Sequence, residues 1–162
     1  MDSHHLSTLF ELLPIGAYRS SVSGRQLRAN AALVRLNGYD SEAEMLAAVN
    51  DISREWYVDP ERRNQFKQLL EREGQVMNFV SVVYRHKTRD RMWIRENAHL
   101  VRNGQGEVIF DEGSVEDISA RRAGEMALRV NEELFRQVTS QLPGMALLAL
   151  LKADGTREYS FV

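Results

Sequence analysis

Three consecutive segments rich in β-branched and aromatic residues constrain the fold of this chain most strongly. They cover residues 76–85, 91–102 and 107–116, and the second and third are joined by Asn103-Gly104-Gln105-Gly106, which has the composition of a hairpin turn. The first connection, around Thr88-Arg89-Asp90, lacks glycine, so we expect a looser or longer turn there. Consecutive strands with short connections pair antiparallel. The chain is therefore predicted to contain a three-strand meander.

The residues before this meander predict two further strands and several short helices. The strands cover residues 15–22 and 26–29 and are joined at Ser23-Gly24. Helices are expected at residues 6–13, 31–37, 41–49 and 60–73, and residues 50–58 are expected to be irregular. Asn30, Ser41 and Asp59 stand where helix caps belong. Strands and helices segregated in this way predict an α+β fold, with one five-stranded antiparallel sheet and helices on one face.

A long helix is predicted directly after the meander. Asp117 and Ser119 are both good helix caps, and residues 120–141 contain no helix breaker except Gly124. Apolar residues there follow a spacing of three and four, at Ala120, Ala123, Ala127, Val130 and Leu134. Two interpretations fit this pattern. The helix either lies on its own sheet or forms a two-stranded coiled coil between protomers.

The C-terminal residues repeat the pattern of the N-terminus. Leu9-Phe10 followed by Leu13-Pro14 corresponds to Leu134-Phe135 followed by Leu142-Pro143, and an apolar strand-like run follows each pair. A repeat of domain size indicates tandem copies of one module. We expect a first module over residues 1–118, a connecting helix over 119–141, and the start of a second, truncated module over 142–162. The chain is therefore expected to be a piece of a longer protein.

Composition and motif searches exclude several functional classes. The net charge of −2 gives no general nucleic-acid surface, and no apolar run is long enough for a membrane helix. The chain has no cysteine and no signal-peptide pattern, so we expect a cytoplasmic protein. The nucleophile-elbow, zinc-protease and phosphate-binding motifs are absent, so no enzymatic activity is expected of this chain.

Several segments together resemble a PAS domain over residues 6–122. The segments that carry the resemblance are Leu13–Arg19, Asn30–Leu33, Leu36–Tyr39, Val58–Arg62, Trp93–Ala98 and Gly113–Arg122. The last includes Asp117-Ile118-Ser119, which is similar to the Asp-Ile-Thr signature of the family. The turn at Thr88-Arg89-Asp90 departs from the pattern, because the Asp-Gly usual there is missing.

The resemblance implies a five-stranded sheet around a ligand-sized interior. It also implies a sensory or dimerisation module of a bacterial signalling protein, whose effector, a histidine kinase or a diguanylate cyclase, lies outside this sequence. Homodimerisation through the N-terminal cap or the connecting helix is expected. Asp117, Ile118 and Ser119 are the predicted signal-transmission residues. A ligand-free structural or docking module is the alternative.

No particular cofactor is indicated. The absence of cysteine argues against a Cys-linked flavin or chromophore, and the helix over 60–73 has no histidine for haem. Eight residues are candidates for binding a small molecule: Tyr18, Phe66, Phe79, Val83, Trp93, Arg95, Asn97 and His99. Arg95 and Asn97 would bind a carboxylate if their strand face points inward; otherwise they form an outward polar face. An apolar interior without a ligand is a further alternative, and no metal site is predicted.

Overall fold

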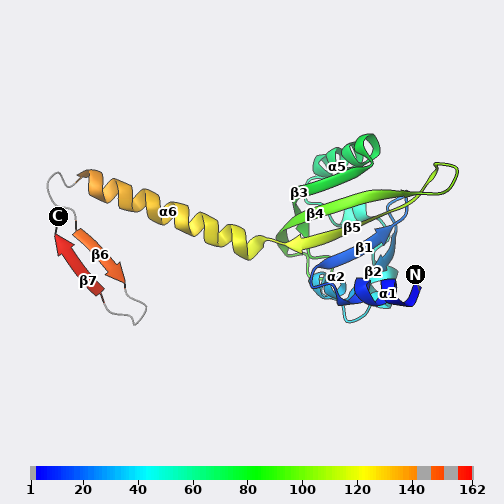
Figure 1. Cartoon of the computed structure of the whole chain (residues 1–162), viewed down its shortest axis with the longest axis horizontal. Coiled ribbons are helices and arrows are strands. Elements are labelled where there is room, and N and C mark those ends of the chain that lie inside the picture. The colour runs from blue at the N-terminus through cyan, green and yellow to red at the C-terminus, as the bar shows by residue number, and fades with distance from the viewer. Residues whose placement is uncertain (1–2, 142–146, 152–156, 162) are drawn as a thin grey trace. The chain divides into compact units, whose positions relative to one another are not determined.

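The computed structural model describes residues 3–141, 147–151 and 157–161 of the chain (Figure 1). The chain divides into two compact units, residues 1–120 and residues 121–162. None of the helices in the described residues has the length and apolar character needed to cross a membrane.

The first unit is built around a five-stranded sheet. Its strands are β1 (Gly16–Ser20), β2 (Gln26–Ala29), β3 (Gln75–Tyr84), β4 (Arg91–Arg102) and β5 (Val108–Asp117). They lie in the order β2-β1-β5-β4-β3, and every neighbouring pair is antiparallel. The predicted five-stranded antiparallel sheet is therefore confirmed. The N-terminal hairpin joins the meander because β1 pairs with the last strand, β5.

The helices begin and end where short-range signals place them. They are α1 (Ser3–Leu12), α2 (Ala31–Leu36), α3 (Glu42–Ala48), α4 (Ile52–Glu55) and α5 (Pro60–Glu73). The side chains of Asn30, Ser41 and Asp59 accept hydrogen bonds from the first turns of α2, α3 and α5. Gly74 ends α5 with φ 74°, the left-handed conformation that favours glycine.

Helix α4 departs from the prediction of an irregular segment. Asp51 precedes this single turn, and its carboxylate accepts hydrogen bonds from the N–H groups of Ser53 and Arg54. Four residues give too little periodicity for a helix to be recognised from apolar spacing. The capping aspartate was therefore the only local signal for this turn.

The core lies between helices α2–α5 and one face of the sheet (Figure 1). Phe66 of α5 is fully buried and meets the ring of Phe79 edge-on at 5.3 Å. On β4, Met92, Ile94, Glu96 and Ala98 face this core. The intervening residues of β4 lie on the opposite face of the sheet because strand side chains alternate.

The turn between β3 and β4 contains no glycine, although turns of this family usually do. Arg89 has φ 63°, so a non-glycine residue occupies the left-handed position of this turn. Its guanidinium lies 4.0 Å from the ring centre of Tyr84 and donates a hydrogen bond to the backbone oxygen of Glu55. Arg89 thus adopts a backbone conformation that glycine adopts more easily, and its side chain contacts Tyr84 and Glu55.

The long C-terminal helix is also confirmed, as α6 (Ser119–Gln141). After it, β6 (Leu147–Leu151) and β7 (Arg157–Phe161) form an antiparallel pair. Such a pair stands where the sequence repeat places the first hairpin of a second module. Residues 142–146, 152–156 and 162 lie outside the described residues, and the second module stays a prediction.

Candidate functional site

A small cavity with polar and apolar lining residues lies in the interior of the first unit. Its volume is about 20 Å³. The polar lining residues, which we call the polar wall, are Tyr18, Ser20, Gln26, Asn37, Arg63, His86 and Glu96. The apolar wall consists of Leu33, Met45, Val49, Ile52 and Trp56. A cavity of this size holds about one water, whereas ligand pockets usually measure roughly 300–1,000 Å³. In this conformation the cavity is therefore smaller than a usual ligand pocket.

Glu96 is the central group of the polar wall. Its carboxylate is fully buried, and each oxygen accepts one hydrogen bond from a tyrosine. The Tyr18 hydroxyl donates to Oε1 at 2.6 Å and the Tyr57 hydroxyl donates to Oε2 at 2.8 Å. Burial raises the pKa of Glu96, although Arg63 and the two hydrogen bonds favour the charged form. Glu96 is therefore a buried acid whose protonation state depends on its neighbours.

Arg63 supplies the positive charge in this cluster. It projects from α5 and is only 6% exposed. Its guanidinium lies 5.4 Å from the ring centre of Tyr57 and 5.1 Å from that of Phe66. Burial disfavours its charge, but the oxygens of Tyr57 and Glu96 outweigh burial and raise the pKa of Arg63. Within the described part of the chain, Arg63 Nε has no hydrogen-bond acceptor.

A second buried acid lies on the neighbouring strand. Asp111 of β5 pairs with Ser20 of β1, and the Ser20 hydroxyl donates to Asp111 Oδ2 at 2.7 Å. Burial raises the pKa of Asp111, against the effects of the Ser20 hydrogen bond and of the charge on Arg63. One cation and two carboxyl groups thus occupy the polar interior.

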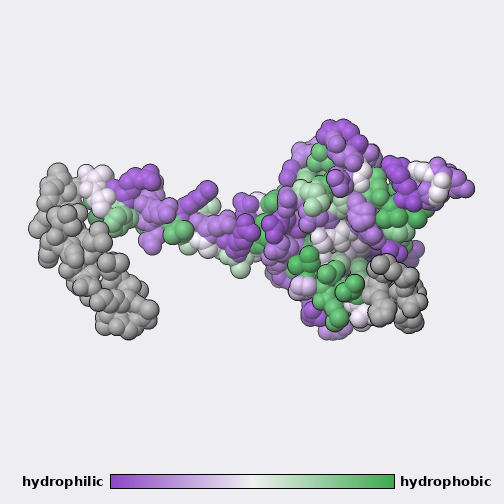
Figure 2. Space-filling view, in the orientation of Figure 1, coloured by the Kyte–Doolittle hydropathy of each residue, from purple (hydrophilic) through white to green (hydrophobic). Residues whose placement is uncertain are grey.

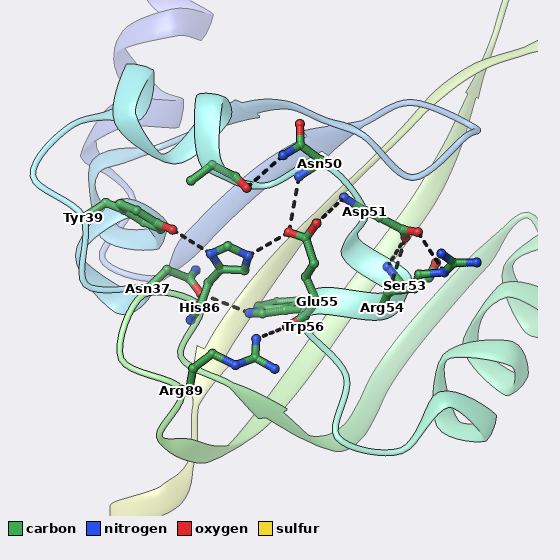
Figure 3. A network of polar contacts seen from close by, with 11 residues as sticks. Asn37, Tyr39, Asn50, Asp51, Ser53, Arg54, Glu55, Trp56, His86 and Arg89 are labelled. Atoms are coloured by element: carbon green, nitrogen blue, oxygen red, sulfur yellow. Dashed lines mark hydrogen bonds and ion pairs between the residues drawn. The ribbon is translucent and has the colours of Figure 1, made fainter.

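A hydrogen-bonded network joins Tyr39 and Glu55 to His86 (Figure 3). His86 follows β3, and its Nδ1 lies 2.6 Å from the Tyr39 hydroxyl while its Nε2 lies 2.8 Å from Glu55 Oε2. The Asn37 side-chain oxygen accepts hydrogen bonds from Trp56 Nε1 and from the His86 backbone N–H. We call Tyr39, His86 and Glu55 the latch. We call the segment of residues 45–56, which carries the lining residues Met45, Val49, Ile52 and Trp56, the cover of the cavity. The latch joins this segment and Tyr39 to the β3–β4 connection.

The residues predicted to bind a ligand divide between the two faces of the sheet. Tyr18 lines the cavity, and Phe66, Phe79 and Val83 belong to the buried core around it. The remaining candidates, Trp93, Arg95, Asn97 and His99, lie on the opposite face. Which of these eight residues contact a ligand stays a prediction. Side chains alternate between the two faces of β4, and the apolar residues Met92, Ile94 and Ala98 face the core. The residues between them therefore point outward.

Arg95 and Asn97 also have partners that differ from the expected carboxylate ligand. Arg95 Nε donates to Glu116 Oε2 at 3.1 Å, and the Asn97 side-chain oxygen accepts from the Asn78 N–H at 2.7 Å. Asn97 and His99 line a wide groove on the outer face, together with Phe10 of α1. The condition for an interior Arg95–Asn97 carboxylate site is therefore not met.

The predicted transmission residues connect the sheet to α6. The Asp117 carboxylate accepts from the Ser119 N–H at 2.8 Å, and its other oxygen lies 3.6 Å from Arg85 Nη2. The Ile118 N–H donates to the Trp93 carbonyl, and the Ser119 hydroxyl accepts from the Trp93 N–H. The first residue of α6 is thus bonded to both β4 and β5.

Sequence reasoning missed four residues that define this site: Tyr57, Arg63, His86 as a latch residue, and Glu96. For Glu96 a usable signal existed, because it shares its strand phase with Met92, Ile94 and Ala98. Arg63 gave no comparable signal, since a charged residue on an amphipathic helix is usually exposed.

Comparisons with known proteins identify the fold of the first unit. No protein-family model matches the sequence, and no curated protein matches it either. An RNA-binding light-oxygen-voltage receptor matches with a TM-score of 0.65 and 20% identity over 81% of this chain, which spans 37% of that receptor. A PAS domain from Colwellia psychrerythraea matches with a TM-score of 0.61 and 16% identity, over 72% of this chain and 97% of that one.

A sensory box histidine kinase/response regulator from Burkholderia thailandensis matches with a TM-score of 0.57 and 21% identity. The match covers 84% of this chain and 99% of that one. The five-stranded antiparallel sheet with its helices fits the PAS fold of these structures. The likenesses show the fold, and the N-terminal unit of this chain has the fold of a PAS domain.

Proposed function

We propose that the first unit is a sensory module that binds a small molecule in its interior and passes the binding event to α6. The observation that carries this proposal is the buried Glu96–Arg63 cluster beside the interior cavity. Burying charges is costly unless they are paired, so a cluster of this kind is a candidate functional site. The likeness to a sensory box histidine kinase supports a role in signalling.

The proposed relay follows hydrogen bonds from the cover of the cavity to the start of α6. Next to the latch residue His86, Arg85 donates to the backbone oxygen of Leu36 and forms an ion pair with Asp117. A ligand that favours an open cover would shift these contacts only if it binds the open and closed conformations with different affinity. The proposed effector is a histidine kinase or a diguanylate cyclase, in a bacterial protein located in the cytoplasm.

We include homodimerisation in the proposal. Leu9, Leu12 and Leu13 are exposed around the C-terminal end of α1, where Figure 2 shows apolar residues gathered on the surface. Helix α6 exposes further apolar residues, among them Leu134 and Phe135. Burying such surfaces against a second copy would remove them from water. Sedimentation analysis of the chain, with Leu12→Glu and Leu134→Glu tested separately, would identify which surface mediates self-association.

A ligand-free docking module is the second candidate, and one observation favours it. The cavity measures only about 20 Å³, and both oxygens of Glu96 already have hydrogen-bond donors. In that case the buried cluster would specify the packing of the core, and the signal would be contact with another protein.

Native mass spectrometry combined with a thermal-shift metabolite screen separates the two candidates. The sensory proposal predicts a saturable shift with at least one small molecule. It also predicts that Val49→Phe, which enlarges a cavity-lining residue, abolishes the shift. Met77→Ala, at an exposed residue of the outer groove, serves as the control and should leave the shift unchanged. Apo spectra with no thermal shift from any compound would instead support the docking module.

A further inference from the structure

The unsatisfied donor of Arg63 suggests which chemical class the interior site takes. Arg63 is 6% exposed and lines the cavity, and its Nε has no acceptor in the described part of the chain. Buried polar groups are normally hydrogen-bonded, so this donor requires an explanation. The hydrogen bonds to the two Glu96 oxygens come from Tyr18 and Tyr57, and Arg63 acts on Glu96 through its charge. An acceptor that enters the cavity, either a water or a ligand, would satisfy this donor.

We propose that the interior site binds a small monocarboxylic acid with an apolar tail, whose carboxyl group contacts Arg63 Nε. This inference rests on the proposed sensory function and names its ligand class. The planar guanidinium pairs best with a planar group that offers two oxygens, such as a carboxylate. The tail lies toward Met45, Val49 and Ile52, which form part of the apolar wall. An acid of about four carbons has both required parts.

The charges around Glu96 determine how an acid can be accommodated. Tyr18 from β1, Tyr57, Arg63 from α5 and Asp111 from β5 all interact electrostatically with Glu96. A bound carboxylate adds a negative charge beside a site that already holds two carboxyl groups and one guanidinium. Uptake of one proton, held by Glu96 or shared with the ligand, restores the charge balance. Binding therefore becomes weaker as the pH rises.

Entry of the acid requires the cover to open. The cavity holds about one water, and a four-carbon acid is several times larger. Met45, Val49, Ile52 and Trp56 lie on the cover segment that the latch holds closed. An open conformation with a displaced cover enlarges the cavity from its apolar side. The polar wall around Arg63 and Glu96 can then remain in place.

Calorimetric titration of the full chain with butyrate tests the proposal. Saturable binding is expected, with proton uptake detected from its dependence on the buffer. Butylamine and butanol carry the same tail without the carboxylate and should bind at least tenfold more weakly, as expected when charge-assisted hydrogen bonds are lost. Arg63→Gln should weaken butyrate binding by about tenfold to a hundredfold. Arg62→Gln is the matched control, because Arg62 donates to the Val80 carbonyl instead.

A measurement on the unaltered chain keeps the test valid if Arg63→Gln does not fold. The Nε–H signal of Arg63 in a proton–nitrogen spectrum should shift on addition of butyrate. Equal binding by the Arg63 and Arg62 variants, or an unchanged signal at saturation, would overturn the proposal. Tighter binding of butylamine or butanol would overturn the carboxylate class but leave a sensory function standing. An absence of binding by every compound of the metabolite screen would remove both.

Discussion

The hydrogen bond between Tyr18 and Glu96 gives the sharpest test of the buried cluster. Tyr18→Phe removes only the hydroxyl that donates to Glu96 Oε1 at 2.6 Å. Both groups are buried, so water cannot easily replace the lost donor. A hydrogen bond to a charged group contributes roughly 1.5–3 kcal/mol, and we expect a loss of about 2 kcal/mol in the free energy of unfolding.

This loss should be visible as a lower melting temperature of the first unit. For a domain of this size, 1 kcal/mol corresponds to about 3–5 °C, so Tyr18→Phe should lower the midpoint by roughly 6–10 °C. The lost bond stabilised the charged carboxylate, so the deficit should be larger at pH 8 than at pH 5. Thermal unfolding followed by circular dichroism at both pH values measures the two effects.

Tyr84→Phe is the matched control for this experiment. Tyr84 is partly buried and contacts Arg89 through its ring, which phenylalanine preserves. We expect this variant to stay within about 0.5 kcal/mol of the original chain. A Tyr18→Phe deficit no larger than that of the control, with no dependence on pH, would refute the assignment of Glu96 as a buried carboxylate held by tyrosine donors.

Three further predictions concern the packing, titration and connection of the same unit. Gly113→Ala should destabilise the unit by about 3 kcal/mol in denaturant unfolding, because its Cβ would lie 2.1 Å from the Asn97 carbonyl oxygen; Gly104→Ala, with open space around it, should be nearly neutral. Because burial raises the pKa of Glu96, stability should fall as pH rises from about 4.3 to the folded pKa, and Glu96→Gln should reduce this slope and leave the part contributed by Asp111. Asp117→Ala should cost about 1 kcal/mol and increase hydrogen exchange in the first turn of α6; unchanged exchange there would contradict the capping role.

The secondary structure was largely predictable because its signals are local. The Asn30, Ser41 and Asp59 side chains bond to backbone groups two or three residues away, so each helix start is visible in a short window of sequence. Gly74 and the Gly104–Gly106 turn mark ends and reversals in the same way. Alternating apolar residues then identified strands, and their order in the chain indicated one antiparallel sheet.

The candidate site depended on contacts between distant residues. Tyr18 and Glu96 are 78 positions apart, and Tyr57 and Glu96 are 39 apart, so no local pattern joins them. The sequence singled out Arg95 for a carboxylate, but Arg95 faces away from the core and pairs with Glu116. Because side chains alternate along a strand, a displacement of one residue would exchange the inward-facing and outward-facing side chains. Arg63, which projects inward from α5, is the arginine that reaches the interior.

The sequence by itself therefore determined the α+β elements, the capped junction at Asp117–Ser119 and the long helix after it. These follow from backbone hydrogen bonds and apolar spacing over a few residues. Only the tertiary structure decided that two acids and one guanidinium share the interior and that the cavity beside them measures about 20 Å³. The physical reason is that burial and charge pairing arise from packing elements together, and no single element contains that information.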